Sequence, residues 1–202
     1  MVLWRAAEPL VLASKSTIRR SVLESAGVPV EIAVADIDER GIESQSGLGD
    51  PGEVAKLLAR EKARAVSVIK PGRMVLGADQ TLALGGRRFS KAPDRAGARE
   101  QLKVLRGSTH ALHSAVAVLR DGSVLYEHVA VARLTMRAFS DEYLESYLDE
   151  VGGAALSSVG GYQLEGRGAQ LTERVEGDHF TVLGMPLFPL LEWLRAAGLL
   201  AK

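Results

Sequence analysis

The chain has 202 residues, of which 47% are hydrophobic and 25% are charged, a composition ordinary for a globular protein. Its 25 basic and 25 acidic side chains cancel, so a general attraction to nucleic acid or to an anionic membrane is not expected. The chain contains no cysteine, which excludes disulfides, cysteine nucleophiles and thiolate metal sites.

No targeting or membrane-spanning segment is predicted. Residues 1–12 are too short a stretch, and are too interrupted by Arg5, Glu8 and Pro9, for a signal peptide. No run of about 18 or more apolar residues occurs in the sequence. Together with the absence of cysteine, these features favour a cytoplasmic protein without a membrane partner.

Strands and helices alternate along the chain. Apolar or alternating patterns predict strands at 10–13, 28–35, 74–78, 81–84, 108–119 and 124–136, the last two joined by a hairpin at Asp121-Gly122. Amphipathic patterns predict helices at 17–26, 51–69, 94–105, 140–150 and 186–197. Between them we expect a mobile loop at 36–50, a glycine-rich irregular segment at 152–168, and a turn with a short strand at 177–183. This order predicts an α/β fold with a mixed sheet.

A first polar cluster separates the strand at 10–13 from the helix that follows it. Ser14, Ser16, Arg19 and Arg20 combine hydroxyl groups, the N–H groups of a helix start and two guanidinium groups, all of which suit phosphate oxygens. A helix cap with two solvated arginines explains the cluster at least as well when it is taken alone. It is not a Walker loop, because the glycines and the Gly-Lys-Ser/Thr end are missing.

Acidic residues at two places in the chain are candidates for metal binding or catalysis. Asp38 and Glu39 follow the second strand, where paired carboxylates can hold a hard divalent cation, although such a pair is more often a solvated turn. Asp79 follows the apolar run 74–78, at the predicted C-terminal end of a buried strand, where α/β folds place ligands. We interpret Asp79 as a metal ligand or an acceptor of a proton from water, in preference to a turn cap.

Three further candidates stand out less. Lys62 lies on the long helix and Lys91 follows a turn, and most lysines are simply solvated. The glycines of segment 160–168 let the backbone approach a ligand closely, and Glu165 is suited to hydrogen-bond the edge of a base. A mobile loop explains that segment equally well when it is considered alone.

The order of these clusters is more informative than any one of them. The following motifs succeed one another: Leu-Ala-Ser-x-Ser-x-x-Arg-Arg at 12–20, Asp-Glu at 38–39, Ala-x-Glu-Lys-Ala at 59–63, Val-Leu-Gly-Ala-Asp at 75–79, Lys-x-Pro at 91–93, Leu-x-Gly-x-x-His at 105–110, Gly-Tyr-x-x-Glu-Gly at 161–166 and Val-x-Gly-x-Pro-Leu at 182–187. Each motif is weak, but the set is specific. Over residues 10–187 the chain resembles the Maf family.

The resemblance implies a fold similar to that of the inosine-triphosphate pyrophosphatases, with an elongated mixed sheet and helices that form two lobes around a cleft. Residues 1–202 would then be a single two-lobed domain that forms a homodimer and uses a divalent metal, Mg²⁺ or Mn²⁺. By position, Asp79 matches the catalytic aspartate and a metal ligand, and Glu39 matches an acidic residue linked to the metal. Residues matched to phosphate binding are Ser14, Arg20, Lys62 and Lys91, with Ser16 and Arg19 in the same loop.

One motif departs from the family pattern. Where the family usually has Gly-Lys-Pro, this chain has Ser90-Lys91-Ala92-Pro93. The inserted Ala92 makes the match of Lys91 less direct than that of the other phosphate-binding candidates.

Three positions bear on the choice of substrate. One branch of the family acts on dTTP and UTP and another on 7-methyl-GTP. The extra residue in the first loop (Ile18), Gln80 after Asp79, and Glu165 in the late motif resemble the second branch. A carboxylate accepts hydrogen bonds from guanine N1–H and N2–H and attracts a positively charged methylated guanine. Ile18, however, stands where that branch often has an aromatic residue.

The resemblance therefore predicts a pyrophosphatase that cuts a nucleoside triphosphate, preferably 7-methyl-GTP, to a monophosphate and pyrophosphate. Asp79 would orient or deprotonate the attacking water. One alternative is a dTTP- and UTP-preferring enzyme of the same family. A different one is a non-catalytic, nucleotide-binding regulator of septum formation. A nucleic-acid-binding protein is disfavoured by the zero net charge.

Overall fold

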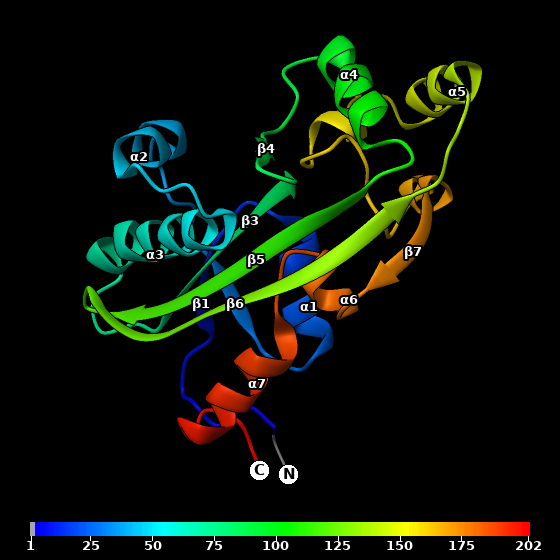
Figure 1. Cartoon of the computed structure of the whole chain (residues 1–202). Helices are drawn as coiled ribbons and strands as arrows, with labels where there is room; N and C mark the ends of the chain where they lie inside the picture. Colours follow the sequence, from blue (N-terminus) through cyan, green and yellow to red (C-terminus); the bar gives the residue numbers. More distant parts are fainter. Residues whose placement is uncertain (1–2) are drawn as a thin grey trace.

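A mixed sheet of seven strands runs through the protein in the computed structural model, which describes residues 3–202 (Figure 1). The strand order is β2-β1-β3-β5-β6-β7, and β4 pairs with β3 outside this path. The strands are β1 (Leu10–Ala13), β2 (Val30–Ile32), β3 (Val75–Leu84), β4 (Arg87–Phe89), β5 (Thr109–Arg120), β6 (Ser123–Met136) and β7 (Thr172–Glu176). The long strands β3, β5 and β6 form its antiparallel centre.

One edge of β3 changes its partner along its length. The first part pairs in parallel with β1, as far as Gly77 opposite Ala13. The last part pairs antiparallel with β4, beginning with Leu82 opposite Phe89. The other edge of β3 pairs with β5 along nearly the whole strand. Within residues 3–202, positions 78–81 therefore have no strand neighbour on the β1 side, and this interruption is called the β3 gap below.

Helices cover both faces of this sheet. They are α1 (Thr17–Ser25), α2 (Glu39–Ser46), α3 (Pro51–Ile69), α4 (Arg95–Leu105), α5 (Asp141–Val151), α6 (His179–Val182) and α7 (Leu187–Ala196), with short 3-10 helices η1 (Gly152–Leu156) and η2 (Arg167–Leu171). None of the helices in the described part of the chain is long and apolar enough to cross a membrane.

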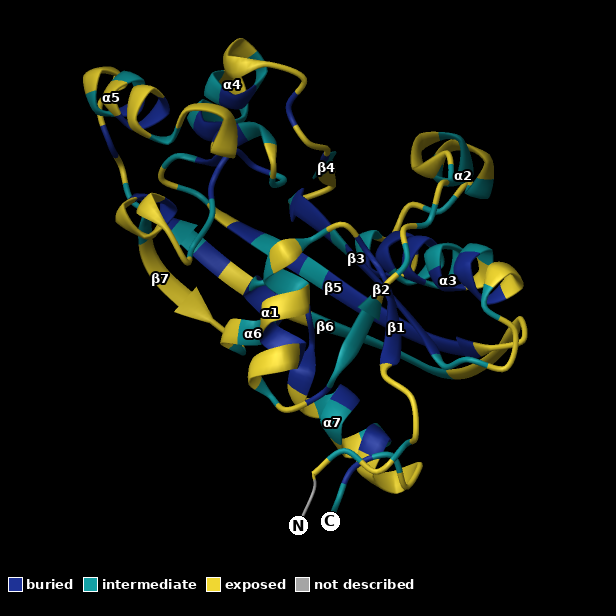
Figure 2. Ribbon diagram, turned by 180° about the vertical axis from the view of Figure 1, so that it is seen from behind, coloured by how far each residue is buried: buried dark blue, intermediate teal, exposed yellow. Residues whose placement is uncertain are grey.

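Three clusters of buried side chains hold these layers together. Because successive strand residues point to opposite faces, Val11 and Ala13 pack under α3 whereas Leu10 and Leu12 pack under α1 and α7. The third cluster joins the C-terminal parts of β3 and β6 and the N-terminal part of β5 to α4 and α5. Figure 2 shows β1 and β3 as almost wholly buried, in contrast to the exposed β7 and α2.

Helix α3 approaches β3 very closely. A Cβ atom added to Gly77 would lie 1.9 Å from the carbonyl oxygen of Ala59 and 2.9 Å from the nitrogen of Ala63. Small side chains on both elements are therefore required at this crossing. The contact fixes the helix turn that carries Lys62 against the strand position two residues before Asp79.

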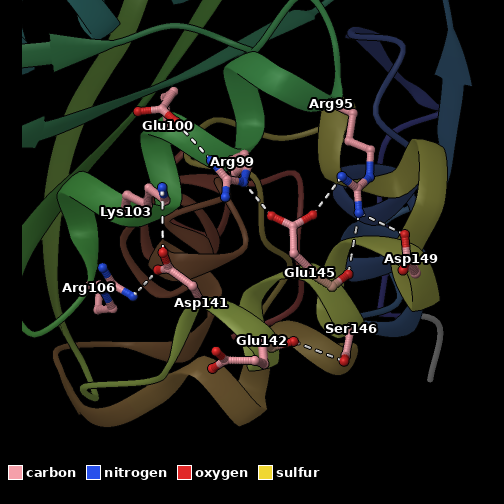
Figure 3. Close-up of polar contacts among 10 residues, drawn as sticks. All are labelled: Arg95, Arg99, Glu100, Lys103, Arg106, Asp141, Glu142, Glu145, Ser146 and Asp149. Carbon is pink, nitrogen blue, oxygen red and sulfur yellow. Dashed lines mark hydrogen bonds and ion pairs between the residues drawn. The ribbon is translucent and has the colours of Figure 1, made fainter.

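Helices α4 and α5 are joined by a network of ion pairs (Figure 3). Arg95 donates to Glu145 at 2.8 Å, Arg99 pairs with the same carboxylate, and Arg106 donates to Asp141 at 2.7 Å. Exposed ion pairs of this kind contribute little to stability, because water and salt screen the charges. The network links the two helices at the surface, and their buried side chains belong to one apolar cluster beneath it.

The α/β class with a mixed sheet flanked by helices is confirmed, but several local expectations are wrong. Segment 36–50 is not a loop throughout, because it contains α2. Asp38 caps this helix by accepting a hydrogen bond from the backbone N–H of Gly41 at 3.0 Å, and Gly47 ends it at a φ of 65°. The strand expected at 28–35 shortens to β2, whose partner β1 has four residues.

Other differences occur nearer the C-terminus and in the centre of the sheet. Segment 177–183 forms α6 instead of a strand, because Asp178 accepts from the backbone N–H and the hydroxyl of Thr181, both at 2.8 Å. Strands β4 and β7 were not expected. The runs at 74–78 and 81–84 are one strand, so Asp79 lies in the middle of β3 and not at its C-terminal end.

Candidate active site

Asp79 lies in the β3 gap, and its side chain is turned towards α3. It is 7% exposed. The ammonium group of Lys62, on α3, donates to Oδ1 of Asp79 at 2.6 Å and lies 2.9 Å from Oε2 of Glu39, the first residue of α2. One lysine thus bridges two carboxylates that come from a strand and from a separate helix.

Burial determines the protonation behaviour of Asp79. Removal from water raises the pKa of this carboxyl, Lys62 and Arg19 oppose the rise by stabilising the charged form, and Glu39 adds to it. A carboxylate with a raised pKa accepts a proton more readily than an exposed one. That property is what a general base requires near neutral pH.

Arg19 closes the β3 gap from the side of α1. Its Nη1 donates to the carbonyl oxygen of Ala78 at 2.7 Å and to Ser14 Oγ at 3.4 Å, and its Nε donates to the carbonyl oxygen of Gly184 at 3.0 Å. The guanidinium thereby gives the carbonyl oxygen of Ala78 a hydrogen-bond donor, because β1 ends before it could pair with that residue. Burial lowers the pKa of Arg19, and the charges of Asp79 and Glu39 oppose that change.

Arg20 does not join this cluster. Its side chain is 54% exposed and donates to Glu24 on the same helix at 2.8 Å. The match by position assigned phosphate binding to Arg20, whereas the structure brings Arg19 next to Asp79.

The two serines lie where α1 begins. Ser14 is buried, and its Oγ accepts from the backbone N–H of Ser16 at 3.2 Å. Ser16 caps α1 by accepting from the backbone N–H of Arg19 at 3.4 Å. The positive end of a helix therefore faces the same gap as the two cations. Ile18, by contrast, packs on the buried cluster beneath α1.

Gln80 points to the face opposite Asp79. Its Nε2 donates to Ser114 Oγ at 2.9 Å and to the carbonyl oxygens of Thr181 at 3.1 Å and Val182 at 2.9 Å. The side chain therefore ties β3 to β5 and to α6. Ser114 and Thr181 are both buried, and their part in this network was not foreseen from the sequence.

Lys91 and Glu165 lie in segments that meet away from Asp79. Lys91 forms an isolated antiparallel bridge with Val159, which directly precedes segment 160–168. Both side chains are exposed, and neither makes an ion pair with any residue between 3 and 202. The structure therefore brings their backbones into one region but does not place their charged groups in the Lys62 cluster.

A buried pair anchors the segment that carries Glu165. His110 is 1% exposed, and its Nε2 lies 2.6 Å from the hydroxyl of Tyr162. Burial lowers the pKa of His110 to about 4 and raises the pKa of Tyr162. Tyr147 also holds this segment, through a 3.2 Å hydrogen bond to the carbonyl oxygen of Gly161. The sequence signal was the histidine that ends the Leu-x-Gly-x-x-His motif.

The acidic groups fit a metal that arrives together with phosphate. No set of three or more histidine, aspartate or glutamate side chains is arranged as a metal site in residues 3–202. Asp79 and Glu39, however, are two oxygen ligands held 2.6 and 2.9 Å from the same ammonium. Magnesium is commonly bound by one or two carboxylates while the substrate phosphates complete its coordination.

The fold and the site define an α/β protein whose interrupted sheet edge gathers two carboxylates, two cations and a helix N-terminus. The family model described as "Maf-like protein" matches residues 9–197. The chain belongs to this family.

Two named relatives match all or nearly all of the chain. A protein of Rhodopseudomonas palustris named nucleoside triphosphate pyrophosphatase is 56% identical over all of both chains. A protein of Rhizobium etli named 7-methyl-GTP pyrophosphatase is 49% identical over 94% of this chain and 96% of its own. Among solved structures, a HAM1 protein from Coxiella burnetii matches 63% of this chain and 72% of its own, with 14% identity and a TM-score of 0.40. This structural similarity is too partial to say anything about the activity of the chain.

Replacing Gly184 by alanine is expected to disturb Arg19. An added Cβ would lie 3.1 Å from Nη2 and 3.2 Å from Nε of Arg19, so the guanidinium has to move by a few tenths of an ångström. We expect kcat/KM for the hydrolysis that the relatives' names describe to fall roughly tenfold, because small misplacements in an active site are costly.

Gly198→Ala is the matched control. Gly198 also has a positive φ, 75° against 82° at Gly184, but a Cβ there meets no described atom within 4 Å. Both substitutions cost about 1 kcal/mol of backbone strain, measured as the free energy of unfolding. In an Arg19→Ala background Gly184→Ala should have no further effect on kcat/KM. An equal loss with and without Arg19 would contradict this account.

His110 should make stability depend on pH. The folded protein keeps this imidazole neutral down to about pH 4, whereas an unfolded histidine titrates near 6.5. As the pH falls from about 6.5 to about 4, the unfolded chain binds the proton first, and the free energy of unfolding decreases. Urea unfolding of His110→Phe should show a smaller decrease than wild type or the exposed-site variant His179→Phe. Parallel curves for all three proteins would disprove the assignment.

Proposed function

We propose that the protein is a nucleoside triphosphate pyrophosphatase, which hydrolyses the bond between the α- and β-phosphates to give a monophosphate and pyrophosphate. The observation that carries the proposal is the ammonium of Lys62 between Asp79 and Glu39, beside the guanidinium of Arg19. The names of the full-length relatives support the same reaction.

Each group in the β3 gap has a role in this reaction. Water attacks the α-phosphorus, its proton passes to the carboxylate of Asp79, and the bond to the β-phosphate oxygen breaks with its electron pair leaving on pyrophosphate. Lys62, Arg19 and the first N–H groups of α1 neutralise negative charge on the phosphates. Magnesium or manganese held by Asp79 and Glu39 would supply further positive charge to the phosphate oxygens when bound.

The proposed preferred substrate is 7-methyl-GTP, and the proposed base-selecting residue is Glu165. Its exposed carboxylate makes no ion pair with a described residue, and the buried His110–Tyr162 pair anchors its segment. A free carboxylate suits both the N–H edge of guanine and the positive charge of its 7-methyl form. Gln80 and Ile18 would influence the choice of substrate indirectly. The amide of Gln80 donates to the carbonyl oxygen of Val182 and so positions α6, and Ile18 packs on the buried cluster beneath α1.

The wider setting follows from the family resemblance. We propose one two-lobed domain over residues 1–202 that acts as a homodimer in the cytoplasm, with Lys91, Ser14 and Ser16 contacting phosphates. No membrane or nucleic-acid partner is included, because the chain has no formal net charge. The dTTP- and UTP-preferring enzyme and the non-catalytic regulator remain the competing functions.

Pyrophosphate release should distinguish these functions. We expect the highest kcat/KM for 7-methyl-GTP in a panel with GTP, dTTP, UTP and CTP, assayed with magnesium or manganese. Glu165→Gln should reduce the preference for 7-methyl-GTP over GTP about tenfold. Both nucleotides offer the same N–H edge, but only 7-methyl-GTP carries a positive charge, and opposite charges about 4 Å apart at a protein surface attract by about 1–4 kcal/mol.

Glu173→Gln, at another exposed glutamate, serves as the control and should keep the wild-type ratio. A preference for dTTP and UTP would retain the enzyme but reject the role of Glu165. Nucleotide binding without any pyrophosphate release would favour the regulator.

A further inference from the structure

Helix α2 is held in place by very little apolar contact. None of its eight described residues is buried, and it includes Gly41 and two serines. Isolated helices shorter than about 12–15 residues are marginal in water even with favourable sequences. Its position must therefore depend on specific polar contacts with the rest of the molecule.

One face of α2 carries two like charges. Glu39 and Glu43 are four residues apart, so their side chains lie on the same face, where like charges destabilise a helix. Each carboxylate has a cation from a different element. Lys62, on α3, contacts Glu39 at 2.9 Å, and Arg88, on β4, contacts Glu43 at 3.0 Å. In the described part of the chain, these two cations make the side-chain ion pairs of α2.

Arg88 also fixes the segment after the helix. Besides two contacts to Oε1 of Glu43, at 3.1 Å from Nε and 3.0 Å from Nη2, its Nη1 donates to the carbonyl oxygens of Leu48 at 3.0 Å and Gly49 at 2.9 Å. The guanidinium presents several donors in a rigid plane, and each of its three nitrogens here contacts α2 or the residues that follow it. Arg88 lies opposite Ala83, just beyond the β3 gap.

We propose that Arg88 is a positioning residue of the active site, which holds α2 so that Glu39 stays beside Lys62 and Asp79. The proposal rests on the proposed function for the role of Glu39 as a metal ligand. Arg88 touches neither Asp79 nor Lys62, and it acts through one turn of α2. Without Arg88, Lys62 is the one remaining cation within residues 3–202 that offsets the repulsion between Glu39 and Glu43. We then expect α2 to unfold locally more often.

Arg88→Gln tests the proposal, with Arg87→Gln as the matched control. Arg87 is the adjacent residue of β4, is exposed, and places its guanidinium over the ring of Phe89 at 4.8 Å, away from α2. Hydrogen–deuterium exchange of residues 39–46, without metal or nucleotide, should become at least about tenfold faster in Arg88→Gln and remain unchanged in Arg87→Gln. Unchanged exchange in β3 and β5 verifies that each variant is folded.

Metal binding gives a second measurement that needs no turnover. We expect the dissociation constant for Mn²⁺, read from the electron paramagnetic resonance signal of the free ion, to rise roughly tenfold or more in Arg88→Gln, because groups that orient metal ligands have effects of this size. Glu43→Gln removes the ion pair and also the repulsion of Glu39, so its effect should be smaller.

Two results would overturn the proposal. Equal exchange of α2 in the two arginine variants would mean that Arg88 does not hold the helix. Faster exchange of α2 with unchanged Mn²⁺ affinity would mean that its position does not matter to the site. Failure of wild type to release pyrophosphate from any nucleotide would instead reject the proposed function. Neither the exchange measurement nor the Mn²⁺ measurement depends on that turnover.

Discussion

The ammonium group of Lys62 makes the arrangement at the β3 gap possible. Asp79 and Glu39 carry like charges, and burial alone would push the proton back onto Asp79. A cation 2.6 Å from one carboxylate and 2.9 Å from the other offsets both effects. Asp79 and Lys62 are largely buried, whereas the side chain of Glu39 is half exposed. Burying an ion pair such as Lys62–Asp79 has a desolvation cost that offsets the attraction between its charges, so the pair is weak evidence for a gain in stability.

Several features of the fold serve to deliver this lysine and its partners. The absence of a side chain at Gly77 lets α3 approach β3, which sets Lys62 at the level of Asp79. The short β1 leaves the carbonyl of Ala78 for Arg19, so the cation that we propose to bind phosphate also replaces a missing strand partner. Gly184 has no side chain and so leaves room for the guanidinium of Arg19. Gln80 holds α6, the helix that precedes Gly184 in the chain. Residues from five of the motifs thus meet at one interruption of the sheet: Arg19, Glu39, Lys62, Asp79 and Gly184.

The strands of the sheet centre could be predicted because burial leaves a clear pattern of apolar residues. The same reasoning singled out Asp79, a charge after a run that is otherwise apolar. Helix α2 left no such signal, because none of its described residues is buried and its stability comes from Lys62 and Arg88, which lie elsewhere in the chain. Strand β7 is mostly exposed and escaped detection for the same reason.

The remaining differences concern orientation. Arg19 and Arg20 are adjacent residues of the same type. Only the rotation of α1 about its axis decides which of them faces the β3 gap. Likewise, the sequence shows that Gln80 is next to Asp79, but the acceptors of its amide group come from β5 and α6, more than thirty residues away. Choices of this kind depend on tertiary packing and cannot be obtained from local patterns.

The most direct test of the account is the fate of oxygen when wild type and Asp79→Asn hydrolyse a nucleoside triphosphate in ¹⁸O-labelled water. If the Asp79 cluster directs water to the α-phosphorus, wild type should place the label in the monophosphate and leave pyrophosphate unlabelled. Asp79→Asn should form the labelled product at least about 100-fold more slowly, the usual size of a general-base contribution. Label in pyrophosphate, or equal rates for the two proteins, would contradict the account.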